Sequence, residues 1–428
     1  MSFTIKKRKF RWLLALALLY LFVFQPPIVP KIYYPITEAI VFLGFLFLNP
    51  WAIRIFRKFQ VEILLGILIL LFSLVRDFAS AEIVYADRFA VWFFQSLILG
   101  IPVAVLLLAY DDSLMDSLPT PLTAAVVLAA VLTLALYYWP AFDLAYRAYQ
   151  IDTIYDKYDG FDVRYRAYGV SENLTFTYGY LLGSFAGYFF LRAEKNFGFM
   201  VLALICLVGV GLNARVGFLA FAIFVIYGVV LEQKWKSLVL LLSGVSVAWI
   251  FILPHVSESI SVQWSQEFFR EMGALIFGGD YGASGSTAAT LFGDFIVWPE
   301  TTVHWMFGNG ESLFGAYGRS SDVGYILQLN YAGIFFLALV FIFQGFTSWR
   351  VIKCLGMRHW FTYYFVSSLI ILNTKGFLFA ATPGGRLVFV LYIFFLLRFY
   401  FGAASGSSGV IASYREVLQR NAYRGRRG

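Results

Sequence analysis

The sequence predicts an all-α, polytopic membrane protein built as a bundle of about 12 transmembrane helices. Apolar residues make up 60% of the 428 residues, and charged residues only 14%. The mean hydropathy is +0.75, far above that of a soluble globular domain. Windows of roughly 17 to 22 apolar residues recur along nearly the whole chain, and each can cross about 30 Å of hydrocarbon as a helix.

The expected spans follow one another within a single integral membrane domain, residues 1–428. The first expected span lacks a small-residue cleavage site and is followed at once by another apolar run, so we expect an anchor and not a signal peptide. The twelve spans are 12–29, 32–50, 60–75, 89–109, 121–140, 173–191, 197–212, 215–231, 237–254, 322–347, 360–380 and 386–401.

The placement of lysine and arginine predicts that both termini are cytoplasmic. Lys6 to Lys9 precede the first span, and twelve crossings put the basic turns near Arg54, Lys234 and Arg350 on the same side as the basic tail, residues 402–428. We therefore expect a multi-pass membrane protein. The net charge of +8 then reflects topology and contact with anionic membrane lipid, and we expect no nucleic-acid partner.

Cofactor and metal chemistry are not indicated by the sequence. Cys206 and Cys354 lie in a span and a cytoplasmic turn without metal-ligand neighbours, and the three histidines are widely scattered. No phosphate-binding loop or dinucleotide fingerprint is present. We expect no cofactor and no metal site.

Two long loops, residues 141–172 and 255–321, are expected on the side opposite the termini, where loops of such length usually carry function. The first loop interleaves tyrosines with acids and cations, including Arg164 and Arg166. That composition suits sugar binding, because aromatic faces stack on sugar rings and carboxylates bind hydroxyls. The alternative is a solvated loop whose tyrosines anchor at the membrane interface.

The end of the second loop carries the most specific motif. Phe307-Gly308-Asn309-Gly310 is followed by Ser321-Asp322, Tyr325-Ile326 and the run Leu329 to Gly333, and an earlier turn reads Asn213-Ala214-Arg215-Val216-Gly217. Together these segments resemble the O-antigen polymerase and ligase superfamily. Ligases of that superfamily typically place a histidine where this chain reads Ser320-Ser321-Asp322, so the resemblance favours the polymerase branch, called Wzy.

The resemblance implies a GT-C-like helix bundle of the bacterial inner membrane, with the two long loops in the periplasm. It also implies metal-independent, inverting glycosyl transfer. The implied donor is an undecaprenyl-pyrophosphate-linked oligosaccharide, the acceptor is the outer sugar of another lipid-linked repeat unit, and a polysaccharide chain-length regulator is a candidate partner. Two alternatives stay open, namely the O-antigen ligase and a flippase or transporter.

Such a reaction needs fixed positive charge for the leaving pyrophosphate and a base for the acceptor hydroxyl. Arg215, Arg319, Lys375 and Arg386 fall at the outer edge of the expected spans and suit the first role. Asp322 is the candidate base, and the motif makes Tyr325 a substrate-binding candidate. The alternative acidic groups are Glu300, Glu311 and Asp294, and His304 is a candidate proton carrier.

Each candidate also has a purely structural interpretation. Asp322 suits the N-cap of the following helix. Arg215 suits a pair with an acid inside the bundle, since an intramembrane cation is costly when unpaired. Arg386 and Lys375 suit interfacial anchors that extend outward, and His304 beside Trp305 suits interfacial packing.

Overall fold

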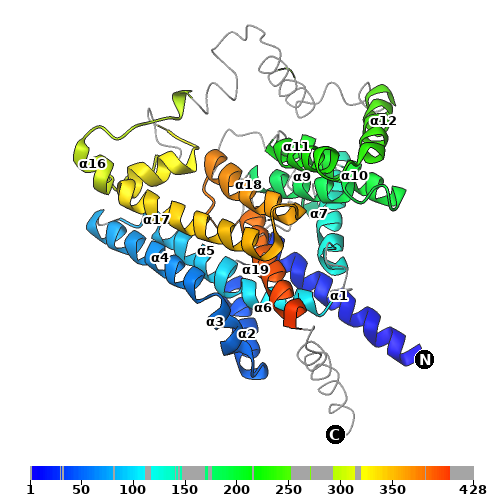
Figure 1. The fold of residues 1–428 in the computed structure, drawn as a ribbon, viewed down its shortest axis with the longest axis horizontal. Coiled ribbons are helices and arrows are strands. Elements are labelled where there is room, and N and C mark those ends of the chain that lie inside the picture. The colour runs from blue at the N-terminus through cyan, green and yellow to red at the C-terminus, as the bar shows by residue number, and fades with distance from the viewer. Residues whose placement is uncertain are drawn as a thin grey trace.

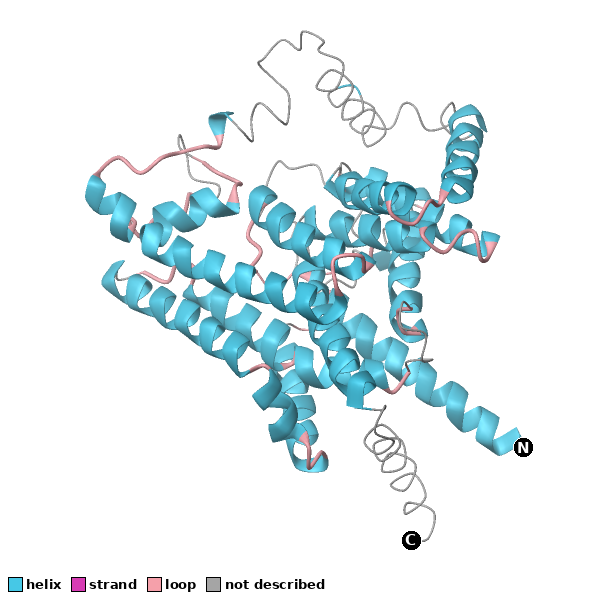
Figure 2. Ribbon diagram, in the orientation of Figure 1, coloured by secondary structure: helices cyan, strands magenta, loops and turns pink. Residues whose placement is uncertain are grey.

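The computed structural model describes an all-helical chain. It covers residues 2–28, 30, 33–80, 82–110, 117–139, 141–142, 145–146, 169–171, 176–214, 216–251, 270, 293–313, 320–380 and 382–404. No strand occurs over these residues (Figure 2). Most of the two expected loops and nearly all of the basic tail lie outside the described residues.

Every one of the twelve apolar windows coincides with at least one helix. The helices are α1 (Ser2–Phe24), α2 (Tyr33–Leu48), α3 (Ala52–Lys58), α4 (Gln60–Ser80), α5 (Ala86–Trp92), the π-helix η1 (Phe93–Ile98), α6 (Gly100–Leu108), α7 (Thr120–Tyr138), α9 (Phe176–Phe190), α10 (Phe197–Asn213), α11 (Val216–Val230), α12 (Trp235–Phe251), α16 (Thr302–Phe307), α17 (Gly324–Leu355), α18 (Trp360–Lys375) and α19 (Pro383–Ala404).

Five helical stretches in the described chain are long and apolar enough to cross a membrane by themselves. These are Gln60–Ser80, Ala86–Leu108, Thr120–Tyr138, Gly324–Leu355 and Pro383–Phe401. The other apolar helices are shorter, and α2 and α3 form a pair bent by 109°. The apolar helices therefore fit a membrane protein, and the figure of twelve crossings stays a prediction.

The α19 helix forms the centre of the bundle (Figure 1). Every side chain from Leu387 to Leu397 is at most 1% exposed, as expected for a helix that is apolar on all sides. Aromatic rings fill the space around it, and the Phe361 and Phe395 rings stack with centroids 4.3 Å apart.

A row of glycines brings α9 against α11. Gly179, Gly183 and Gly187 recur at four-residue spacing, so they share one face of the helix. A Cβ atom added at Gly183 would overlap the backbone of Gly217 at the start of α11, and one at Gly187 would overlap the Phe224 ring. Small residues permit such close backbone approach between membrane helices.

The α17 helix reverses direction at Gly333, where φ is 77° and ψ is −174°. The Tyr325 ring stacks on Phe341 at 5.2 Å, and its hydroxyl donates to Gln344 Oε1 at 3.1 Å. In a straight helix those residues would be about 24 Å or more apart at 1.5 Å per residue. Residues 324–332 therefore fold back along residues 334–355, which alone are long enough to span a membrane.

Candidate functional site

Three breaks between helices lie near one another, and the first and third contact the first turn of α9. The first break includes Ala214 between α10 and α11, the second is 320–323 before α17, and the third lies between α18 and α19 and includes residues 376–380 and 382. A Cβ atom at Gly179 would lie 2.8 Å from the Ala214 carbonyl oxygen, one at Gly384 would lie 2.6 Å from the Thr177 carbonyl oxygen, and one at Gly376 would overlap the Phe176 ring.

Such breaks indicate a functional region in a membrane protein. Non-helical backbone at membrane depth is tolerated where it is buried in protein or lines a cavity, and binding sites of membrane proteins often use interrupted helices. Phe377, Leu378 and Phe379 in the third break are at most 8% exposed. The third break is therefore packed inside the protein.

An ion pair lies where the second and third breaks meet. Asp322 Oδ2 is 3.6 Å from Lys375 Nζ, and their side chains are 39% and 26% exposed. The N-cap of α17 is Val323, and the Val323 N–H donates to Ser321 Oγ at 3.1 Å. Asp322 thus lies one residue before the N-cap, and its partly exposed carboxylate contacts Lys375.

Two buried amides fix the start of α17 against the end of α18. Gln328 Nε2 donates to Asn373 Oδ1 at 2.8 Å, and Asn373 Nδ2 donates back to Gln328 Oε1 at 3.2 Å. A Cβ atom at Gly324 would overlap the Gly376 carbonyl oxygen, so the two backbones touch. This packing sets the separation of Asp322 from Lys375.

The ion pair is recessed relative to the turn at Gly333. Tyr325 lies beside Gln344, which is about 17 Å along the helix from Gly333 at 1.5 Å per residue. The returning helix 324–332 therefore carries Asp322 away from the turn and into the bundle.

The Gly-Asn-Gly segment packs onto that turn. Because the helix breaks at Gly333, nearby carbonyls accept from outside the helix, and the N–H groups of Asn309 and Gly310 donate to the carbonyl oxygens of Asn330 and Tyr331 at 2.7 and 3.1 Å. Gly308, Gly310 and Gly333 have φ of 71°, 80° and 77°, values that favour glycine. The two halves of the motif are thus one structural unit.

Two residues of this unit were missed by sequence reasoning. Arg76 Nε donates to the Tyr331 carbonyl oxygen at 3.1 Å, and Arg76 Nη2 donates to the Gly308 carbonyl oxygen at 3.3 Å. Asp77 accepts from the Tyr331 hydroxyl at 2.5 Å and from the N–H of Ala86 at 2.8 Å. The sequence signal that could have identified Arg76 and Asp77 is that these two charged residues directly follow the apolar window 60–75.

Arg386 is bound by residues of α1 and η1. It is 0% exposed, so it does not extend outward as an interfacial anchor. Its guanidinium donates to Gln95 Oε1 at 3.0 Å and to the Val23 carbonyl oxygen at 2.7 Å. Gln95 Nε2 donates in turn to Glu38 at 2.9 Å. In this structure Arg386 ties α19 to α1 and η1.

The remaining candidates lie elsewhere or outside the described residues. His304 is half-buried on α16, and Glu300 and Glu311 are exposed. Glu311 Oε2 accepts from Asn309 Nδ2 at 2.8 Å, which places Glu311 at the Gly333 turn and at the opposite end of the returning helix from Asp322. Arg215, Arg319, Arg164 and Arg166 lie outside the described residues.

The described residues contain no group of three histidine, cysteine, aspartate or glutamate side chains that could hold a metal ion. No protein-family model matches this chain, and no curated protein sequence matches it at a significant level.

Proposed function

We propose that this chain is an O-antigen polymerase of the bacterial inner membrane, a glycosyltransferase that joins undecaprenyl-pyrophosphate-linked repeat units at the periplasmic face. The observation that carries the proposal is the Asp322–Lys375 pair, 3.6 Å apart, recessed where two helix breaks meet. It combines an acceptor for a hydroxyl proton with a cation for an anionic leaving group. The substrate class is inferred from the surrounding sequence motifs, which resemble the O-antigen polymerase and ligase superfamily.

In the proposed reaction the acceptor hydroxyl oxygen attacks the anomeric carbon of the donor sugar. The bond from that carbon to the pyrophosphate oxygen breaks on the opposite face, and undecaprenyl pyrophosphate leaves with the electron pair. Asp322 takes the hydroxyl proton. A single base suffices for this inverting displacement, unlike a double displacement with two carboxylates.

Lys375 would stabilise the negative charge that develops on the leaving pyrophosphate. Arg215 and Arg319 are proposed as further cations of the same clamp. Arg215 follows Ala214, which contacts the first turn of α9, and Arg319 precedes Ser320 at the second break. Arginine suits this role because its planar guanidinium binds phosphate oxygens in a bidentate manner.

The direct test is a complementation experiment with Asp322→Asn in cells that lack the wild-type chain. We expect long-chain polysaccharide to fall by about 100-fold or more, the range typical of a lost general base, while single repeat units on the lipid A-core persist. Gel analysis of lipopolysaccharide gives the chain-length ladder, and immunoblotting gives the protein level. Glu311→Gln is the matched control, because Glu311 lies at the far end of the returning helix. An unchanged ladder with Asp322→Asn would contradict the assigned base.

Interrupted helices also occur in transporters, so the flippase alternative needs its own test. The purified chain, incubated in detergent with lipid-linked repeat units, should produce longer oligosaccharides, because polymerisation needs no separate compartments. A flippase gives no product in detergent. A ligase needs a lipid A-core acceptor. Loss of a ligase from the cell would remove even the single repeat unit from the lipid A-core.

A further inference from the structure

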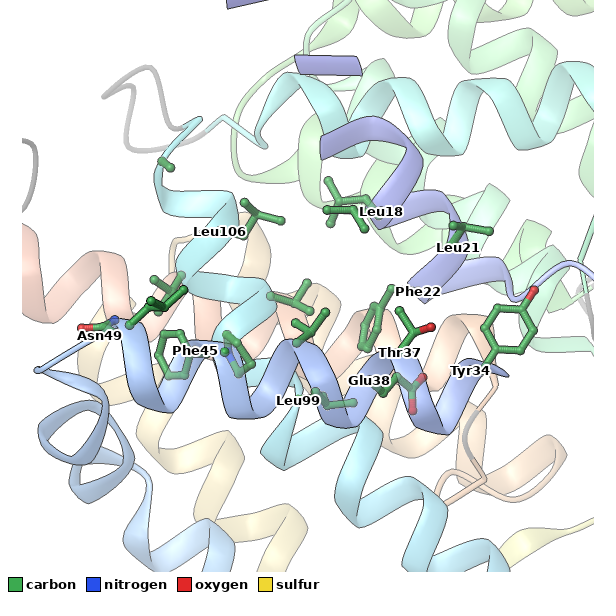
Figure 3. A pocket seen from close by; sticks show the side chains of 18 of the residues that line it. Leu18, Leu21, Phe22, Tyr34, Thr37, Glu38, Phe45, Asn49, Leu99 and Leu106 are labelled. Carbon is green, nitrogen blue, oxygen red and sulfur yellow. The ribbon is translucent and has the colours of Figure 1, made fainter. Parts of the chain in front are cut away.

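An apolar groove of about 510 Å³ runs between α1, α2 and α6 (Figure 3). Its volume falls within the range of small-molecule pockets, about 300 to 1,000 Å³. Leu18, Phe22, Val41, Phe45 and Leu106 are among the side chains that line it. In Figure 3 Glu38 lies toward one end of the groove and Asn49 at the other.

The side of α2 that carries Gly44 leaves open space, whereas Phe42 packs against Phe56 and Phe94. At one end Glu38 accepts from Gln25 Nε2 and Gln95 Nε2, both at 2.9 Å. At the other end the chain bends by 109° into α3. Between them Gly44 lines the groove, and a Cβ atom added there would meet nothing within 4 Å. Open space therefore lies beside the middle of α2.

The length of the groove matches a lipid chain. From Thr37 to Leu48 the helix rises about 17 Å at 1.5 Å per residue, close to the half-thickness of a hydrocarbon core about 30 Å deep. The groove also borders apolar surface, since Val41 is 41% exposed and Leu48 is 83% exposed. In a membrane, hydrocarbon chains are the apolar groups that surround such a surface.

The Asn49 end of the groove is basic. Trp51 lines it, and the Arg54 guanidinium carbon lies 4.3 Å from the Trp51 ring centroid. Arg54 and Arg57 are both exposed on α3, the helix that turns sharply away from α2. Exposed cations at a membrane surface attract anionic headgroups.

We propose that this groove binds one acyl chain of an anionic phospholipid, with the lipid phosphate at Arg54. The apolar lining suits an acyl chain, and the length of the groove matches a chain from one leaflet. The exposed Arg54 cation beside Trp51 suits the anionic headgroup. The site is separate from the Asp322–Lys375 pair and does not depend on the proposed function.

Photolabelling of the full chain in lipid nanodiscs tests this proposal. The probe is phosphatidylglycerol with a photoreactive group in its acyl chain, and we expect labelled peptides from α2 and α6. Gly44→Trp should fill the groove and reduce that labelling at least fivefold. The matched control is Gly345→Trp on α17, where an added Cβ atom also meets nothing within 4 Å and labelling of α2 and α6 should not change.

Equal labelling of α2 and α6 in the wild-type chain and Gly44→Trp would overturn the groove as the site. Val41→Trp provides a second filling variant if Gly44→Trp does not fold. The headgroup assignment has a separate test, because Arg54→Gln should weaken phosphatidylglycerol labelling about fivefold and leave labelling by phosphatidylethanolamine unchanged. Equal wild-type labelling by both lipids would overturn the anionic preference.

Discussion

Two ion pairs, one near each sequence end of α17, differ in how fully the protein encloses them. Arg350 pairs with Glu62, and the two side chains are 11% and 1% exposed. Asp322 pairs with Lys375, and those side chains are 39% and 26% exposed. Arg350 also donates to the Tyr400 hydroxyl, at 3.0 Å from Nη2, and to the Lys58 carbonyl oxygen, and Tyr392 donates to Glu62.

The difference separates a structural pair from one that a ligand can reach. Removing one partner of a buried pair leaves a charge that is costly to bury. A partly exposed pair is screened by solvent and contributes little to stability. The Asp322–Lys375 pair can therefore exchange its partner for a substrate at small cost, whereas the Arg350–Glu62 pair cannot.

The largest expected effect is on the buried pair. Arg350→Met should lower the free energy of unfolding by about 3 to 5 kcal/mol, because it leaves the Glu62 carboxylate buried without its cation. Denaturant unfolding of the purified chain in detergent measures the change. Arg358→Met is the control, because Arg358 is an exposed arginine between α17 and α18. It should change stability little. A loss below about 1 kcal/mol for Arg350→Met would remove the contrast between the two pairs.

An intermediate effect is expected at the contact that positions the exposed pair. Gly324→Ala should destabilise the chain by about 1 to 3 kcal/mol through overpacking, since its Cβ atom would overlap the Gly376 carbonyl oxygen. It should also shorten the polysaccharide ladder, because Asp322 and Lys375 move apart. Gly345→Ala has open space around it and should be neutral or slightly stabilising. Equal stability of the two variants would show that the Gly324 contact is not tight.

The sequence predicted where helices form more reliably than how they meet. Apolar windows located the helices because each segment must satisfy its own backbone in lipid. The reversal at Gly333 was not predicted, since the apolar pattern continues through it from Leu329 to Val340. The partners of Arg76 and Arg386 lie 255 and 291 residues away in the chain. No local pattern carries such information.

For the candidate site too, the sequence predicted which residues matter better than how their side chains are arranged. The motif singled out Asp322 as the candidate base, and the structure adds Lys375 as its partner. Glu311 lies at the other end of helix 324–332 from Asp322, because the chain folds back at Gly333, which has a positive φ. Arg386 resembled the other recessed cations in sequence, yet its side chain packs toward α1 and η1. Side-chain direction depends on packing that spacing alone does not specify.

The smallest expected effect on stability is at the exposed pair itself. Lys375→Met should change the free energy of unfolding by less than about 1 kcal/mol, since solvent already screens a pair that is 39% and 26% exposed. The same variant should strongly reduce long-chain polysaccharide, because the leaving pyrophosphate loses a cation. Lys353→Met, at an exposed lysine near the other end of α17, should leave both stability and the ladder unchanged. If Lys375→Met instead lowered stability as much as Arg350→Met, the Asp322–Lys375 pair would be a structural element like the Arg350–Glu62 pair. The site would then need another cation.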